Sequence, residues 1–349
     1  MANLDWDNYI RGAINAESLE RCKRLEGPTM ADQRELMSQV FRHHKPRRIA
    51  CLGAGSLNDI PIGEFLMGGS EVFLVDWIPE ISLEGFRGGL IEREEGNIKC
   101  MICDERCDPR KYCAGYREPV RVAGTVCAAF ELSQEHYPRC AAYAPGEEPR
   151  FLTSDITLGR ASSFARRAMK FIPSSRTMEQ CFRKGMNEVR KCDDIEEEIA
   201  IPGDTVDLVT SSMVVSQFDH EPYDFFSKLI MERFGLQQVV DREERVMHMI
   251  ERLRGELFQT LVEGHVQEMY RILNKQHGKV YLSVELFRSL PQQEDSYFLV
   301  HGIAQALDVL NRYFHFEFSP IPPEQSLRKR AARTGYSIIQ CLVMSPIAA

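Results

Sequence analysis

The chain has 349 residues, 44% of them hydrophobic, and a formal net charge of −8 at pH 7. This length fits about two domains, or one enlarged domain with insertions, of an ordinary globular protein. The acidic balance argues against broad attraction to nucleic acid, and no apolar run approaches the roughly 20 residues that cross a bilayer. Because the start carries no cationic and apolar leader, we expect no membrane partner and a cytoplasmic location.

Residues 1–45 predict two helices ahead of the main domain, residues 46–349. Apolar residues recur at helical spacing from Tyr9 to Cys22, and a Gly-Pro pair then breaks the pattern. A second helical pattern follows and stops at Pro46. These helices would cover an edge of the structure that follows.

A glycine turn between two apolar runs is the central feature of the sequence. The run Ile49–Leu52 breaks at Gly53-Ala54-Gly55, and a second run, from Glu71, ends on Asp76 and Trp77. Glycine admits backbone angles that other residues resist and lets the chain pass close to a ligand. Ligands of open α/β sheets collect at the carboxyl ends of the strands. We therefore expect a nucleotide site in which the Asp76 carboxylate accepts the ribose hydroxyls.

Cysteines are concentrated in the segment 97–149, which we interpret as an insertion. Four of the eleven cysteines fall within 14 residues, at Cys100, Cys103, Cys107 and Cys113. Without a secretion signal, this density indicates a metal rather than disulfides, and a Cys-x2-Cys turn supplies two zinc ligands. We expect Zn²⁺ on these four thiolates, as a staple for a segment rich in Gly and Pro. Substitute ligands are Cys127, His136 and Cys140; an iron-sulfur cluster, redox chemistry and reduced structural thiols are the alternatives.

The segments on either side of this insertion continue an alternation of strands and helices. Pro79–Glu95 is predicted as the helix after the second strand, and the run from Arg150 as a short third strand that ends on Asp155. The Asp155 carboxylate either serves a ligand or caps a helix that begins at Thr157. A second insertion, 160–203, is basic at first and acidic later, which indicates a solvated helical pair or, alternatively, a contact surface for an anionic substrate.

The second half of the chain predicts further strands and a long helix. The apolar run Val206–Val209 is a buried strand, from whose carboxyl end Ser211-Ser212-Met213 would emerge. Glu243–Leu273 has apolar residues at spacings of three and four, which predicts one long core-packed helix or two in series. Three more strands are expected, with a connection at 320–333 between the last two: Lys279–Phe287, Tyr313–Phe318 and Tyr336–Met344.

The order of these elements resembles the class I S-adenosylmethionine-dependent methyltransferase family. The turn Gly53-Ala54-Gly55 lacks the third glycine of the dinucleotide fingerprint, and Asp76, with an aromatic residue behind it, follows Gly55 by 21 residues. A closing pair of strands is also the usual end of that family's sheet. The resemblance implies an α/β fold with a doubly wound, mostly parallel seven-stranded sheet, an antiparallel last strand, N-terminal helices and the Cys-rich insertion.

The resemblance also implies roles for individual residues. In that family the glycine turn, here Gly53, Ala54 and Gly55, lies under the methionine part of the cofactor, and the acid, here Asp76, holds the ribose. The next residue packs on adenine, as Trp77 would. The third strand ends in an acid for the adenine amino group and an apolar neighbour, as Asp155 and Ile156 would. In that family the residues that follow the fourth strand lie beside the transferred methyl group, as Ser211, Ser212 and Met213 would. Residues 1–45 would then form a lid over the cofactor, if they do not merely cover a sheet edge.

Two positions depart from the family's pattern. Cys51 stands where the family often has an acid, and Leu57 stands where it often has a third glycine. The fourth strand is not followed by Asn-Pro-Pro-Tyr or Asp-Pro-Pro-Tyr, the signature of enzymes that methylate exocyclic amines of bases. The resemblance therefore implies methyl transfer from S-adenosylmethionine to a small molecule, with a protein substrate as the other option and nucleic acid disfavoured.

The sequence singles out no catalytic residue. A general base would serve only to deprotonate the methyl acceptor, and four residues near the ends of the fourth and fifth strands are candidates: Asp219, His220, Tyr223 and Glu285. Two other functions are alternatives. One is a noncatalytic binding or scaffold protein with a metal-stapled insertion, and the other is a nicotinamide-dependent oxidoreductase, to which the absent third glycine is the main objection.

Overall fold

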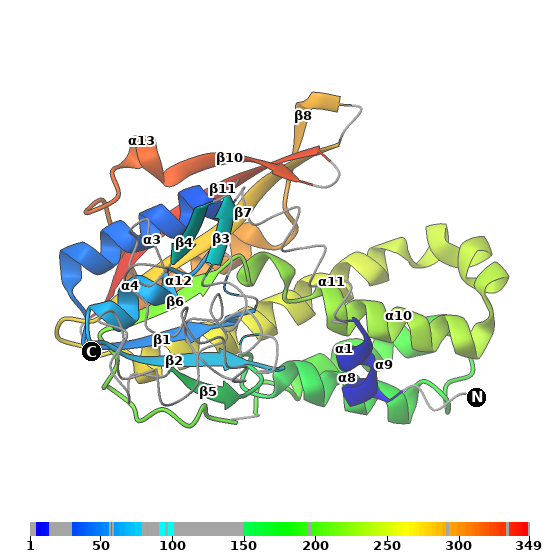
Figure 1. Ribbon diagram of the computed structural model, residues 1–349. Helices are drawn as coiled ribbons and strands as arrows, with labels where there is room; N and C mark the ends of the chain where they lie inside the picture. Colours follow the sequence, from blue (N-terminus) through cyan, green and yellow to red (C-terminus); the bar gives the residue numbers. More distant parts are fainter. Residues whose placement is uncertain are drawn as a thin grey trace.

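A parallel sheet forms the centre of the molecule. The computed structural model describes residues 5–13, 30–55, 57, 59–78, 82, 91–94, 97–100, 149–194, 197–290, 293–332 and 335–347. Five strands run parallel to one another: β1 (Arg48–Leu52), β2 (Glu71–Asp76), β5 (Arg150–Thr153), β6 (Leu208–Ser212) and β7 (Lys279–Leu290). Their order is β7-β6-β1-β2-β5, so the strand order reverses beside β1 (Figure 1). Open α/β sheets bind ligands at such a reversal.

The last strands of the sheet are antiparallel. β11 (Gly335–Pro346) runs antiparallel to β7, and β9 (Phe314–Glu317) and β10 (Leu327–Ala332) both pair with β11. β8 (Gln293–Leu299) folds back on the end of β7. The described sheet thus has nine strands: the seven that the sequence predicts, and β8 and β10 in addition. The prediction of a doubly wound, mostly parallel sheet with an antiparallel last strand is confirmed.

Two segments fold differently from the prediction. Ile91–Glu94, which was expected at the end of a helix, is strand β3 and pairs with β4 (Asn97–Cys100) in a separate two-stranded sheet. Gly96 stands between them in the sequence, and hairpin turns favour glycine. The second difference is in the expected connection 320–333, which contains the short helix α13 (Pro323–Ser326) and strand β10. The sequence of β10 has no apolar run that would predict a strand. This segment is a strand because its backbone pairs with the edge of β11.

Helices cover both faces of the sheet. On one face, α3 (Ala31–His44) and α4 (Ile62–Met67) share a core with Ile49 and Cys51 of β1. The alternate residues of the same strand, Ala50 and Leu52, face a second core that includes α8 (Arg160–Phe171), α11 (Leu236–Ile272) and α12 (Ile303–Tyr313). This alternation is what a strand buried on both faces requires, and it gives a three-layer α/β/α architecture.

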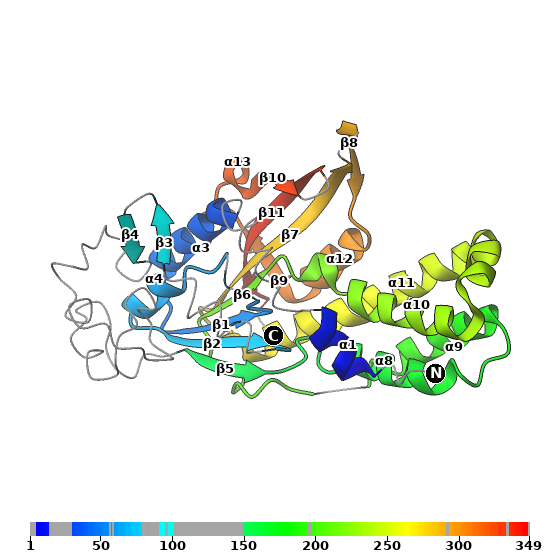
Figure 2. The ribbon, with the colours of Figure 1, turned by 45° about the vertical axis from the view of Figure 1, so that its right-hand side comes forward.

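A helical lobe lies beside the sheet. It contains α1 (Trp6–Ala13), α8, α9 (Met178–Arg190), α10 (His220–Phe234) and the first half of α11 (Figures 1 and 2). The helical prediction for 160–203 is confirmed in α8 and α9, but the pair is not solvated all round. Each helix buries an apolar side, with Phe164 and Phe182 among the buried residues. Both phenylalanines contact Phe226 of α10. The charged residues lie toward the outer sides except Arg160, which is 3% exposed and donates to the carbonyl oxygen of Thr260 in α11.

The predicted helix at Glu243–Leu273 is one continuous helix, α11, of 37 residues. At 1.5 Å per residue it is about 55 Å long, and it runs from the lobe to the sheet (Figure 2). It is amphipathic rather than apolar throughout. Among the described residues, no helix has both the length and the apolar composition that a transmembrane segment needs.

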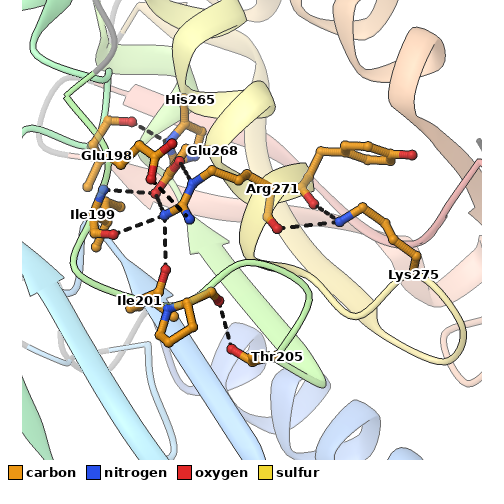
Figure 3. Close-up of polar contacts among 11 residues, drawn as sticks. Glu198, Ile199, Ile201, Thr205, His265, Glu268, Arg271 and Lys275 are labelled. Atoms are coloured by element: carbon orange, nitrogen blue, oxygen red, sulfur yellow. Dashed lines mark hydrogen bonds and ion pairs between the residues drawn. The ribbon is translucent and has the colours of Figure 1, made fainter.

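An ion pair near the end of α11 holds the segment that leads into β6 (Figure 3). Glu268, only 1% exposed, accepts two hydrogen bonds from Arg271 and one from the backbone N–H of Ile199. The Arg271 guanidinium also donates to the carbonyl oxygens of Ile199 and Ile201, at 2.9 and 3.0 Å. Lys275 donates to the carbonyl oxygen of Leu273 at 2.7 Å and so satisfies an orphan acceptor beyond the helix. The backbone at the end of the second insertion, at Ile199 and Ile201, is therefore hydrogen-bonded to side chains of α11.

Alanine substitutions at two glycines of α11, Gly264 and Gly255, are expected to change the stability of the protein in opposite directions. A Cβ at Gly264 would lie 2.6 Å from the carbonyl oxygen of Thr157 and 2.9 Å from Cδ of Arg160, whereas a Cβ at Gly255 would meet nothing within 4 Å. Since backbone cannot yield as a flexible side chain can, Gly264→Ala is expected to destabilise the protein by about 1 to 3 kcal/mol. Gly255→Ala should stabilise it by about 0.5 to 1 kcal/mol through helix propensity. Urea denaturation of both variants measures the difference, and equal effects would contradict the close approach of α8 to α11.

Candidate functional site

The glycine turn after β1 has the backbone conformation that its glycines allow. Gly53 and Gly55 have φ of +69° and +50°, in the left-handed region that other residues resist. The backbone N–H groups of Gly53 and Ala54 both donate to the Val75 carbonyl oxygen, which ties the turn to the end of β2. Leu57 also has a positive φ, +61°. It therefore takes a glycine-like conformation at the position where the methyltransferase pattern often has a third glycine.

Asp76 fastens the turn from the neighbouring strand. Its Oδ2 accepts the N–H of Gly55 at 2.8 Å, and its Oδ1 accepts the N–H of Ile78 at 3.1 Å. Burial raises the pKa of Asp76, and the backbone N–H groups of Gly55, Ile78 and Trp77 oppose this increase by stabilising the carboxylate. The two carboxylate oxygens have about four acceptor positions in all, so capacity remains for a ligand hydroxyl beside these three N–H groups.

Gly53 lies where the ends of three strands meet. A Cβ on Gly53 would be 2.5 Å from Cγ2 of Val214, which follows β6, and 3.2 Å from Cδ1 of Ile156, which follows β5. No other residue type fits there without moving these side chains. Among the described residues, a Cβ on Gly55 would meet only the Gly53 carbonyl oxygen, at 3.9 Å. Within this part of the chain, the turn is thus packed tightly at Gly53 and leaves room beside Gly55.

The Asp155 carboxylate is engaged at the start of α8. Its Oδ1 accepts from the backbone N–H and the hydroxyl of Thr157, and its Oδ2 accepts from the backbone N–H and the hydroxyl of Ser162. These four contacts fill the usual acceptor capacity of a carboxylate. They favour the helix-capping role that the sequence left open, while a contact with the adenine amino group stays a prediction.

A buried histidine joins two of the strand ends. His265, in α11, is 0% exposed; its Nε2 lies 2.9 Å from Oγ of Ser211 and its Nδ1 3.0 Å from the carbonyl oxygen of Ile156. Burial lowers the pKa of His265 to about 4, and the Ile156 carbonyl opposes this only in part. The sequence prediction missed this residue. It occupies an apolar position of the helix, three residues after Val262 and four after Leu261, and a polar residue there was the available signal.

The three residues expected beside the methyl group differ in their surroundings. Ser211 is fully buried against His265, whereas Ser212 is only partly buried and its hydroxyl lies 2.6 Å from that of Ser283 in β7. Met213 has φ of +60° and is held by its N–H, which bonds to Ser283. A non-glycine residue in this conformation costs about 1 to 3 kcal/mol and is typical of functional sites. Ser211 therefore lies on the side of the sheet that α11 covers, whereas Met213 belongs to the core on the side of α3 and α4.

Helix α1 packs on the residue that follows Asp76. The ring of Trp6 lies 6.0 Å from that of Trp77, edge to face, and 5.1 Å from that of Phe225 in α10. The hydroxyl of Tyr9 lies 2.5 Å from Oδ2 of Asp224 and 3.0 Å from Oε2 of Glu221, both in α10. Helix α1 therefore connects the end of β2 to the first turns of α10. Of the rest of the expected lid, 1–45, residues 1–4 and 14–29 lie outside the described residues, and α3 packs on a face of the sheet.

The four candidate bases are engaged with neighbours to different degrees. Asp219 is 4% exposed and accepts two hydrogen bonds from Arg254, at 2.8 and 2.9 Å. Glu285, also buried, accepts from Arg288 and from the hydroxyl of Ser337. Both carboxylates thus have structural partners. His220 and Glu221 are paired, which raises the pKa of the histidine and lowers that of the glutamate, and the Arg254 guanidinium lies over the ring of Tyr223.

The predicted zinc ligands fall almost entirely outside the described residues. Cys100 ends β4, and Cys103, Cys107 and Cys113, with the substitutes Cys127, His136 and Cys140, lie in the segment that the structure does not describe. Within the part that is described, no group of three or more His, Cys, Asp and Glu residues could hold a metal ion. The metal site remains a prediction.

The chain has no recognised relative in two comparisons with known proteins. No family model matches it, and no curated protein sequence is significantly similar. The geometry of the strand ends and the pattern of the sequence are therefore the features of this chain that indicate a function.

Proposed function

We propose that the protein is an S-adenosylmethionine-dependent methyltransferase that acts on a small molecule. The observation that carries the proposal is the convergence at Gly53 of the ends of β1, β5 and β6 beside the Asp76 carboxylate of β2. Three positions expected from the sequence to touch one cofactor, Gly53, Asp76 and Ile156, thus lie together at the edge of the sheet where such folds bind ligands, and Val214 directly follows the expected residues of the fourth strand.

The side chains present fit an adenosyl group. Asp76 keeps acceptor capacity for a ribose hydroxyl, and among the described residues there is room for a ligand beside Gly55. Trp77, next along the chain, is an aromatic surface on which adenine would stack. Ile156 would supply an apolar contact at the opposite side of the turn.

The strand order at the end of the sheet favours a methyltransferase over the alternative function, a nicotinamide-dependent oxidoreductase. The usual dinucleotide fold has strand order 3-2-1-4-5-6, whereas here the antiparallel β11 lies between β7 and β9. The third glycine of the dinucleotide fingerprint is absent as well, with Asn58 in its place. Both observations favour a cofactor with one nucleoside and no pyrophosphate.

Bound S-adenosylmethionine would supply a methyl group on a sulfonium, ready for in-line displacement. The residues of this chain would then bind the cofactor, orient the acceptor and exclude water. Ser212 and Met213 lie at the carboxyl end of β6, beside the Ser283 hydroxyl of β7. This is where the acceptor would approach, under the helix α1 that Trp6 anchors on Trp77.

Calorimetry with S-adenosylhomocysteine tests the proposal. We expect micromolar binding by the wild-type protein and a loss of at least about tenfold in Asp76→Ala, because a charged or buried hydrogen-bond acceptor contributes about 1.5 to 3 kcal/mol. The proposal fails if a folded wild-type sample does not bind; binding without turnover on any acceptor would favour the scaffold alternative.

Asp207→Ala is the matched control for this experiment. Like Asp76, Asp207 accepts two backbone N–H groups, those of Arg47 and Arg48. It does so at the amino end of β1, on the edge opposite the proposed site. Both variants should lose stability, but only the Asp76 variant should lose affinity, and a parallel loss would mean that affinity follows stability alone.

A further inference from the structure

The hydrogen bonds of His265 fix its tautomer. A carbonyl oxygen only accepts, so Nδ1, 3.0 Å from the Ile156 oxygen, carries the proton. Because the ring is fully buried and neutral near pH 7, Nε2 has a free lone pair, and the hydroxyl of Ser211 donates to it at 2.9 Å. The ring of Phe218 packs edge to face on the imidazole, at 4.9 Å. The two hydrogen bonds and this contact hold the ring in one orientation.

The Nδ1 bond reaches the proposed cofactor site, and the Nε2 bond does not. Ile156 lies against the glycine turn, 3.2 Å from the position of a Gly53 Cβ. The loop from Asp155 to Gly159 has no strand neighbour of its own, and His265 attaches it to α11. Ser211, by contrast, is buried within the sheet and is already held by its strand pairs with Leu52 and Leu282.

We infer that His265 is a positioning residue of the cofactor site, which holds Ile156 at the adenine side through the bond from Nδ1 to its carbonyl oxygen. This inference rests on the proposed function. His265 acts through Ile156 and does not itself touch the ligand. The bond to Ser211 stabilises the fold without affecting the affinity for the nucleoside.

Two substitutions separate the two bonds of the imidazole. The side-chain amide nitrogen of asparagine is two bonds from Cβ, as Nδ1 is, so His265→Asn keeps a donor for Ile156 and loses the acceptor for Ser211. The amide oxygen of glutamine is three bonds from Cβ, as Nε2 is, so His265→Gln keeps the acceptor and loses the donor. Each variant leaves one buried polar group without its partner, so both should lose stability to a similar extent.

The experiment is calorimetry of the full chain with S-adenosylhomocysteine and with 5′-methylthioadenosine, which lacks the amino-acid part. We expect His265→Gln to weaken both ligands by about tenfold and His265→Asn to weaken them by less than about threefold. Ser211→Ala, which removes only the Nε2 bond, should resemble the asparagine variant. An equal loss of affinity in the Asn and Gln variants, or none in either, would overturn the inference, because a purely structural histidine would not distinguish them.

A second variant covers the case in which His265→Gln does not fold. Ile156 is partly exposed, so Ile156→Ala should fold, and it should weaken 5′-methylthioadenosine by about tenfold, since an apolar contact of a few methyl groups is lost. Unchanged affinity in this variant would overturn the inference. Failure of the proposed function is distinct from either result, because the wild-type protein itself would then not bind the two ligands.

Discussion

Arg271→Ala is expected to lower the free energy of unfolding by about 3 to 5 kcal/mol, which is the cost of breaking a buried ion pair from one side. Among the described residues, the substitution leaves the Glu268 carboxylate, 1% exposed, with the N–H of Ile199 as its one hydrogen-bond partner. It also removes the donor to the carbonyl oxygens of Ile199 and Ile201. Urea denaturation followed by circular dichroism measures the effect, and the segment before β6 should become open to proteolysis.

The same helix offers a control for this prediction. Arg252 and Glu256 form an ion pair at 2.8 Å, and the arginine side chain is 59% exposed. Arg252→Ala should cost no more than about 0.5 kcal/mol, because water and salt screen exposed pairs. The double variant Glu268→Leu with Arg271→Met should be more stable than Arg271→Ala, since no charge is left buried. A loss of less than about 1 kcal/mol in Arg271→Ala would contradict this account of the ion pair.

The second large effect is a pH dependence that depends on His265. The pKa of this histidine is about 4 in the folded protein and about 6.5 when unfolded. Between these values the unfolded chain binds more protons, so the free energy of unfolding should fall as the pH falls from 6.5 to 4. The decrease amounts to about 3 kcal/mol for this one group. Above pH 6.5 both states hold the ring neutral, and the contribution is constant.

His265→Asn isolates this contribution because asparagine does not titrate. Urea denaturation between pH 4 and pH 7.5 should show a shallower pH dependence for the variant than for the wild-type protein. Glu188, Asp224 and Glu317 have lowered pKa values, owing to hydrogen bonds from Lys191, Lys228 and Lys279 among others. The stabilisation that these three carboxylates provide is also lost on acidification, but at lower pH than the contribution of His265. This loss is equal in the wild-type protein and in the His265→Asn variant. Parallel curves would mean that the imidazole is protonated at its ordinary pH in the folded state.

The strands of the sheet could be predicted because each is an apolar run that ends at a turn. Ile49–Leu52 and Glu71–Asp76 are strands with almost the predicted bounds, since a strand buried on both faces needs such a run. β8 and β10 could not be predicted. Three of the six residues of Leu327–Ala332 are basic, and this segment pairs because β11 extends beyond the residues that pair with β9.

The contacts within the site were less predictable than its position. Asp76 and the glycine turn lie together as expected. The Asp155 carboxylate, however, accepts hydrogen bonds from Thr157 and Ser162. The same sequence pattern fits both a carboxylate that contacts a ligand and one that caps a helix. His265 is 109 residues from Ile156. Only the packing of α11 on the sheet brings them together, and no local pattern encodes that distance.

The contact between Trp6 and Trp77 also gives the protein an internal optical probe. The chain has two tryptophans, and their rings lie 6.0 Å apart, one on α1 and the other next to the proposed sugar-binding carboxylate. All indole emission therefore originates at one place on the molecule. A ligand that enters beneath α1, or a movement of that helix, would change the entire tryptophan signal without any added label.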